Sequence, residues 1–280
     1  MRWGAPTSNG GSVITSYEAR AYALASGGAP VASCTSSTLQ CAISGLTNGQ
    51  AMWIEVSAIN AVGAGPATSP RIQATPAVGF TPNDPYYAGG SLWGLNGAYG
   101  VNAPDAWTIT RGSASTVVAV LDTGSTVHPD LDGTTVPGYD MISDPAVAVD
   151  GNGRDADPSD AGDASGGYSS SWHGTHVAGT INAVASNGVG VVGVAPDVKV
   201  QPVRVVGAGG GYTSDILVGI TWASGGAVPG IPANPTPARV INMSLGGYGA
   251  CSPDWQSKID DAVSRGTTVV VAAGNSNADA

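Results

Sequence analysis

The chain has 280 residues, of which 42 are glycine, 19 are proline and only 11% are charged. Its net charge is −10 and its ten basic residues do not cluster, which argues against a nucleic-acid partner because phosphate binding relies on grouped Lys and Arg. No apolar run approaches the roughly 20 residues that span a bilayer, so we expect no membrane partner. The first residues, MRWGAPTSNG, contain no signal peptide, so any export signal is expected upstream of Met1.

Residues 1–76 predict a small all-β module. Short β-type runs such as SVITSYEARAYAL and AMWIEVSAIN are separated by turn signals, NGG at 9–11 and TNG at 47–49. Cys34 and Cys41 are close enough in sequence to staple one hairpin, and we favour a disulfide over two buried thiols. The stretches RWGAPTSNGGSVITSY, ISGLTNG and VSAINAVGAGPAT resemble a fibronectin type III domain, a β-sandwich whose first strand is missing from this sequence.

Residues 77–90, AVGFTPNDPYYAGG, are rich in Pro and Gly and indicate a linker or docking segment. From residue 91 to 280, apolar runs alternate with helical patterns, which predicts a parallel sheet covered by helices on both faces. The expected strands lie at 115–121, 198–205, 238–244 and 267–273. The expected helices lie after His173, at TSDILVGITWAS and at DWQSKIDDAVSRG. Their apolar stripes are Ile216, Leu217, Ile220 and Ala223, and Trp255, Ile259, Ala262 and Val263.

Polar residues follow several of these apolar runs, at the places where open parallel sheets gather reactive groups. Asp122 follows VVAVL, His173 opens a helical run, and Asn275 follows VVVAAG. These positions would bring a carboxylate, an imidazole at a helix start and a carboxamide donor to one edge of the sheet. Acyl transfer uses these groups, but the nucleophile that it also needs is missing.

Five motifs in order resemble the subtilase family: VAVLDTGSTVHPDL (118–131), WHGTHVAGTI (172–181), GVAPDVKVQPVRV (193–205), INMSLGG (241–247) and VVVAAGNS (269–276). The resemblance implies a subtilisin-like α/β domain in which Asp122 orients His173, His173 acts as the general base, and Asn275 donates to the oxyanion. It also implies a secreted, monomeric endopeptidase with polypeptide substrates. The residues implied to bind an extended peptide are Gly210, Gly211, Tyr212, Ser244, Leu245, Gly246, Gly247, Ala273 and Gly274.

The nucleophile of this family lies in a Gly-Thr-Ser-Met-Ala type segment, and no such segment occurs up to Ala280. We therefore expect the catalytic serine beyond the end of this sequence, and we expect the 280-residue chain itself to be inactive. Relatives in the family commonly pair a cysteine at the position of Cys251 with one near the glycine run at 209–211. No cysteine stands there, so Cys251 is expected to be unpaired.

An acidic segment predicts a cation site. Seven of the twenty acidic residues lie between Asp140 and Asp163, in a stretch with one arginine, so we favour structural calcium over a solvated acidic loop. The candidate ligands are Asp150, Asn152, Asp155 and Asp157. His173 and His176 could suggest a zinc pair, but no third ligand with metal-site spacing follows, so we assign no cofactor to catalysis.

Two other functions fit parts of the sequence. A non-catalytic protein could use the same scaffold to hold peptides or polysaccharide, but the intact Asp122, His173 and Asn275 argue against it. An esterase or other acyl transferase could use the same triad, and the segments typical of peptide-strand binding make it the weaker alternative.

Overall fold

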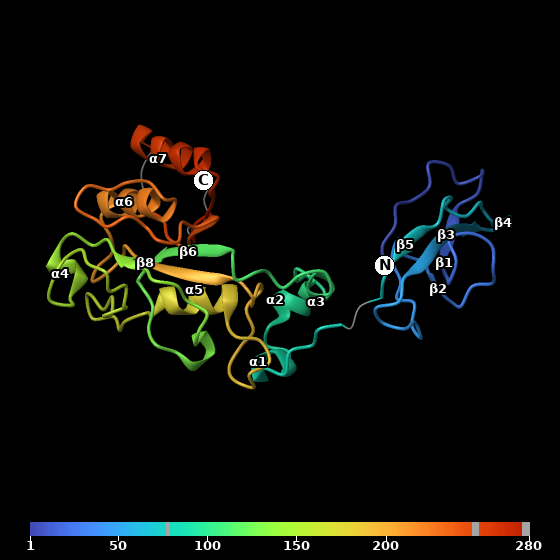
Figure 1. The fold of residues 1–280 in the computed structure, drawn as a ribbon, viewed down its shortest axis with the longest axis horizontal. Helices are drawn as coiled ribbons and strands as arrows, with labels where there is room; N and C mark the ends of the chain where they lie inside the picture. Colours follow the sequence, from blue (N-terminus) through green and yellow to red (C-terminus); the bar gives the residue numbers. More distant parts are fainter. Residues whose placement is uncertain (77–78, 248–251, 276–280) are drawn as a thin grey trace. The chain divides into compact units, whose positions relative to one another are not determined.

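The computed structural model describes residues 1–76, 79–247 and 252–275, and it divides into two compact units, Met1–Gly79 and Phe80–Ala280 (Figure 1). Residues 80–90, which we predicted within a linker, belong to the second unit. They contain helix α1 (Pro85–Ala88), whose Tyr87 is buried against Trp107. Asp84 is fully buried and accepts a hydrogen bond from the Ser186 amide at 2.8 Å. Pro and Gly shape turns of the packed unit here, so composition alone placed its boundary too late.

The first unit is built on one antiparallel sheet. Its strands are β1 (Ile14–Tyr22), β2 (Ala32–Ser36), β3 (Met52–Asn60), β4 (Gly63–Ala64) and β5 (Ile72–Ala74). They are ordered β2-β1-β3-β4, and β5 also pairs with β3. Within its described residues, this unit has strands and no helix, as an all-β module requires. Outside this sheet its described part has one isolated bridge, between Arg2 and Gln40, so a second full sheet is not formed there. The fibronectin type III identity stays a prediction.

The period-two pattern explains why β1 and β3 pair with one face buried. Ala21, Met52 and Ile54 form a small apolar cluster on that face. At Glu55 the side chain accepts hydrogen bonds from the Tyr22 hydroxyl at 2.5 Å and from Arg71 Nε at 3.0 Å. Polar cross-strand contacts therefore hold together the same strands that the apolar cluster joins.

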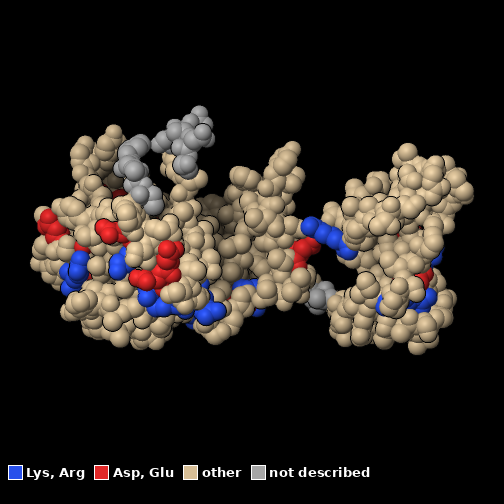
Figure 2. Space-filling view, turned by 90° about the horizontal axis from the view of Figure 1, so that it is seen from above, with Lys and Arg blue, Asp and Glu red and all other residues tan. Residues whose placement is uncertain are grey.

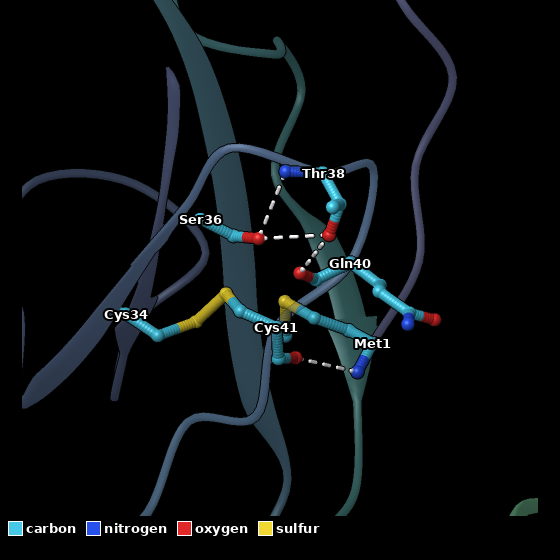
Figure 3. Close-up of a disulfide and its surroundings, with 6 residues drawn as sticks. All are labelled: Met1, Cys34, Ser36, Thr38, Gln40 and Cys41. Carbon is cyan, nitrogen blue, oxygen red and sulfur yellow. Dashed lines mark hydrogen bonds between the residues drawn. A yellow bond between two sulfur atoms is a disulfide. The ribbon is translucent and has the colours of Figure 1, made fainter. Parts of the chain in front are cut away.

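A disulfide joins Cys34, in β2, to Cys41, with Cα atoms 6.2 Å apart, as the spacing predicted (Figure 3). Next to it, the amino group of Met1 donates to the Cys41 carbonyl at 2.9 Å, and the Cys41 amide donates to the Met1 carbonyl at 3.2 Å. The bridge therefore closes the loop after β2, and the two hydrogen bonds join that loop to the first residue of the chain. Cys251 lies outside the described residues.

The second unit contains the predicted parallel sheet, ordered β10-β9-β6-β8-β7. Its strands are β6 (Val117–Asp122), β7 (Tyr139–Asp140), β8 (Lys199–Arg204), β9 (Val240–Met243) and β10 (Thr268–Val271). Its helices after α1 are α2 (Trp93–Asn96), α3 (Ala103–Trp107), α4 (Pro145–Ala148), α5 (His173–Asn182), α6 (Thr213–Ala223) and α7 (Pro253–Ser264), with a 3₁₀ turn η1 at Pro129–Leu131. None of the helices in the described ranges has the length and apolar character of a membrane span.

Helices cover both faces of this sheet, as predicted. On one face, α5 packs through Ala178 against Val120 and Val200; on the other, α6 packs through Ile220 against Leu121 (Figure 1). Because successive strand residues point to opposite faces, Val120 packs against the α5 side of the sheet and Leu121 against the α6 side. β6 is central and all six of its residues are buried.

The apolar stripe predicted for α6 is confirmed, since Ile216, Ile220 and Ala223 are buried and Leu217 packs against the same cluster. On α7 the stripe is narrower than predicted. Ala262 is buried, but Val263 is exposed. α7 contacts α6 and the edge strand β10, so only a thin line of its surface meets the core.

Leu121 lies at the centre of this core with no exposed surface. We expect Leu121→Ala to lower the free energy of unfolding of the second unit by about 3 kcal/mol, because it removes buried methyl groups and leaves a cavity. Urea denaturation followed by tryptophan fluorescence measures this change. The exposed Val127 supplies the control, and Val127→Ala should shift stability by less than about 0.5 kcal/mol. Equal effects of the two substitutions would contradict the assignment of the core.

Candidate active site

The carboxyl ends of the parallel strands gather the predicted site residues at one edge of the sheet. Asp122 is the last residue of β6. Ser244–Gly247 follow β9, Ala273–Asn275 follow β10, and Gly210–Tyr212 lie between β8 and α6. Because parallel strands end on the same side, these segments border one edge, where open α/β sheets bind ligands.

Asp122 and His173 are in direct contact. Nδ1 of His173 lies 2.8 Å from Oδ1 and 2.9 Å from Oδ2 of Asp122. The Asp122 side chain is 2% exposed, whereas the His173 side chain is 48% exposed. A buried carboxylate therefore holds one ring nitrogen, while the rest of the imidazole remains open to solvent and to a reacting group.

Burial raises the pKa of Asp122 above its usual value. Hydrogen bonds from His173 and from the Thr123 amide oppose the rise, and the charge of nearby Asp160 adds to it. The Thr123 amide donates to Asp122 Oδ1 at 2.8 Å. The groups that contact the carboxylate thus oppose the effect of its burial on the pKa.

α5 begins against the turn that follows β6. A Cβ added to Gly174 would lie 2.1 Å from the Gly124 carbonyl oxygen, so only glycine allows this approach of the two backbones. At Trp172, just before the helix, the backbone is left-handed, with φ 53°. Thr175 follows Gly174 in the helix, and its hydroxyl accepts a hydrogen bond from the Thr126 amide at 2.9 Å. These contacts set the start of the helix beside Asp122.

The predicted peptide-binding glycines fall into two groups. A Cβ added at Gly210, Gly246, Gly247 or Gly274 would meet no described atom within 4 Å, and at Gly210 and Gly274 the positive φ (+124° and +87°) itself favours glycine. At Gly211 the added Cβ would lie 2.3 Å from the Val205 carbonyl oxygen, so that glycine is required by the fold itself. Exposed Tyr212 donates a hydrogen bond from its hydroxyl to Asp144 at 3.3 Å.

The segments after β9 and β10 remain close to each other beyond the ends of the strands. The Ala272 amide donates to the Met243 carbonyl at 3.1 Å, and Asn242 donates to the Ser244 hydroxyl at 3.0 Å. Asn275 is exposed and follows Gly274, whose φ is +87°. The carboxamide predicted as the oxyanion donor is therefore open to solvent at the same sheet edge as Asp122.

The acidic segment is tied to the protein by arginines. Fully buried Arg204 donates through one nitrogen to Asp140 and to Asp150, at 2.6 Å in each case. A second arginine, Arg154, binds the buried carboxylate of Asp215 at 2.6 Å. On the face shown in Figure 2, charged side chains are few, and acidic and basic ones are interspersed. Arginine thus pairs with two of the seven acidic residues of the segment, Asp140 and Asp150.

The four predicted calcium ligands do not converge as they are arranged in this structure. Asp150 binds Arg204, and Asp155 accepts hydrogen bonds from the Asn152 side-chain amide and the Asp157 backbone amide, both at 2.7 Å. Asp157 accepts from the Ser159 hydroxyl at 2.5 Å. Within the ranges that the structure describes, no three His, Cys, Asp or Glu side chains gather in a way that could hold a metal ion. A cation bound here would therefore require these side chains to rearrange.

Sequence reasoning missed the buried partners of this edge, above all Arg204 and Asp160. Arg204 lies between Val203 and Val205 in the run VKVQPVRV, and an arginine between apolar residues of a predicted buried strand is the signal that could have indicated a buried ion pair. Asp160 gave no such signal, because it is one of several similar aspartates in the acidic segment.

Known proteins share both the sequence and the fold of the second unit. Residues 113–280 match the family described as "Subtilase family". The chain is 55% identical over 205 residues to the "Extracellular protease" of Xanthomonas campestris pv. campestris, across 70% of this chain and 35% of that protein. It is 49% identical over 212 residues to the "Extracellular basic protease" of Dichelobacter nodosus, across 71% and 35%. The chain spans about a third of the length of these curated relatives.

A solved structure described as proteases from Pseudoalteromonas arctica is 55% identical to this chain. The likeness has a TM-score of 0.65 and covers 71% of this chain and 60% of that one. Sequence and fold therefore agree on the same family of proteins.

The arginine network predicts an unusual pH dependence. Burial raises the pKa of Asp140 to about 6, against the opposing effects of the Ile142 amide and Arg204. An acid with a higher pKa in the folded state binds more protons there than in the unfolded state, so its contribution to stability falls as pH rises from about 4 to about 6. We expect the stability difference between wild type and Asp140→Asn to fall by up to about 3 kcal/mol across this window.

Urea unfolding at four pH values between 4 and 7 measures this difference. Asp197→Asn is the control, because its ion pair with Arg111 lies at the surface and carries no comparable burial. Stability curves of wild type and Asp140→Asn that run parallel from pH 4 to pH 7 would contradict the prediction.

Proposed function

Because the chain belongs to the subtilase family, we propose that this protein is a secreted serine endopeptidase that hydrolyses peptide bonds through an Asp-His-Ser triad. The single observation that carries the proposal is the contact between buried Asp122 and half-exposed His173 at the carboxyl edge of a parallel sheet. A disulfide in the first unit and relatives named extracellular proteases support an oxidising, external location.

In this mechanism His173 takes the proton of the attacking serine hydroxyl and later gives it to the leaving amine. Its Nδ1 faces Asp122, so the other ring nitrogen is the one available to the serine. Asp122 fixes the tautomer of the ring and stabilises the imidazolium as it forms. Asn275 donates to the developing oxyanion, a contribution of roughly 3 to 4 kcal/mol in such sites.

Polypeptides are the proposed substrates. The segments at 210–212, 244–247 and 273–274 would pair with an extended peptide backbone, and the open space at several of their glycines suits that close approach. The serine is proposed to be contributed by sequence beyond Ala280, since no Gly-Thr-Ser-Met-Ala type segment occurs among the 280 residues. The chain by itself is then inactive.

The test is to express the reading frame extended beyond Ala280 and to measure casein hydrolysis with and without a serine-directed phosphonylating inhibitor. We expect inhibitor-sensitive cleavage that falls about a millionfold in His173→Ala. His176→Ala is the matched control, because His176 is exposed on the same helix and should be dispensable. Absence of both cleavage and inhibitor labelling would instead favour a peptide- or polysaccharide-binding protein.

We also propose, from the sequence pattern, structural calcium at residues 150–157, with no part in the chemistry. Asn152 now turns its amide nitrogen to Asp155, so an ion would require the amide to rotate and present its oxygen. Calcium at 100 times its dissociation constant would stabilise the fold by about 2.7 kcal/mol. Differential scanning calorimetry should then show a higher Tm with calcium than with EDTA, and no such difference in Asp155→Asn. An equal Tm in both buffers would contradict calcium binding.

A further inference from the structure

The hydroxyl of Thr123 lies at a junction between three segments. It accepts a hydrogen bond from the Gly174 amide at 3.0 Å and donates one to Asp160 Oδ2 at 2.6 Å. The amide of the same residue donates to Asp122, as described above. One residue therefore links the proposed catalytic carboxylate, the start of α5 and the acidic segment.

The start of α5 depends on this hydroxyl. The first amides of a helix have no partner within the helix, and a side chain at the residue before it commonly accepts one of them. Trp172 occupies that place and provides no side-chain cap. Thr123, from the end of another element, supplies the acceptor for the Gly174 amide instead. His173 precedes that amide directly, so the same bond fixes its backbone.

Asp160 determines which way the hydroxyl points. A threonine hydroxyl has one hydrogen, and a carboxylate accepts it more strongly than a neutral acceptor does. With that hydrogen directed to Asp160, the lone pairs of the Thr123 oxygen remain available to the Gly174 amide. Asp160 is itself held firmly. It is buried, its Oδ1 accepts the Gly162 amide at 2.8 Å, and its own amide donates to the Ser125 carbonyl at 3.2 Å.

We propose that Asp160 is a positioning residue for the Asp122–His173 pair, acting through the Thr123 hydroxyl that it orients. This proposal rests on the proposed function in one respect: the Asp122–His173 pair is taken to be catalytic. It assigns to the acidic segment a role in holding the site, because Asp160 lies in the segment that Arg204 anchors at Asp140 and Asp150.

Electrostatics agree with this placement. Asp160 brings a second negative charge close to Asp122, and this raises the pKa of Asp122. Another acid, Asp163, accepts hydrogen bonds from the Ser171 amide at 2.6 Å and hydroxyl at 2.7 Å, just before His173. Asp163 therefore holds the segment just before His173, while Asp160, through Thr123, holds the amide just after it.

The experiment reads the proton shared by His173 and Asp122 in the far-downfield proton NMR spectrum of the 280-residue chain, with histidine labelled with ¹⁵N. We expect Thr123→Val and Asp160→Ala to lose or shift this resonance, because the start of α5 is no longer fixed. Thr123→Ser keeps the hydroxyl and should restore it. Asp132→Ala removes an exposed aspartate of the same unit and should leave it unchanged.

Near-UV circular dichroism establishes that each variant is folded. Asp160→Asn, which keeps the shape of the side chain, replaces Asp160→Ala if the latter does not fold. A resonance that keeps its position and intensity in both folded Thr123→Val and the folded Asp160 variant would overturn the proposal.

A second readout uses the longer, cleaving form of the protein. We expect Thr123→Val to lower kcat by about tenfold to a hundredfold with little change in KM, since the bound peptide is unaffected and only the pair is misplaced. The NMR measurement needs no turnover, so the two proposals can fail separately. If the variants change the resonance but the longer wild-type chain does not cleave casein, the proposed protease function is refuted and the positioning role stands. If the longer chain cleaves casein but the variants leave the resonance unchanged, the positioning role is refuted and the protease function stands.

Discussion

The contact between a buried carboxylate and a half-exposed imidazole constrains the rest of the second unit. Asp122 belongs to the central strand of the sheet, whereas His173 opens a helix on one face of it. For Nδ1 to lie 2.8 Å from the carboxylate, the turn after β6 and the first turn of α5 must touch backbone to backbone. Gly124 and Gly174 allow that approach, and the layered packing on both sides of β6 holds it.

Several of the few charged residues of this protein are buried, where an unpaired charge is costly. Asp122, Asp140, Asp160 and Asp215 are all buried, and each accepts a hydrogen bond from a specific donor of the protein. Isolated buried charges are strongly unfavourable, so these carboxylates demand fixed partners. Such partners also restrict motion, which is what a site that must hold two side chains in one geometry requires.

Most of the second unit could be predicted from the sequence, because its strands and helices follow the simple periods of apolar residues. Placement of Asp122 at the end of β6 and of His173 at the start of α5 followed from those periods and from the family motifs. The partners of the acidic segment could not be predicted, since hydrogen bonds such as that between Asp160 and Thr123 join residues far apart in sequence. The calcium hypothesis came from counting charges, and composition could not show that Arg204 binds two of them.

The order of strands in the parallel sheet has a consequence for how this domain folds. β6 is the first strand of the sheet to be synthesised, yet its neighbours are β8 and β9, which come much later in the chain. A central apolar strand therefore waits without a partner while the ribosome makes the acidic segment and α5. Pairings of such long sequence separation fold slowly and expose apolar surface meanwhile. The segment made during that interval carries seven acidic residues, so negative charge is added to the growing chain while its core strand still lacks both neighbours.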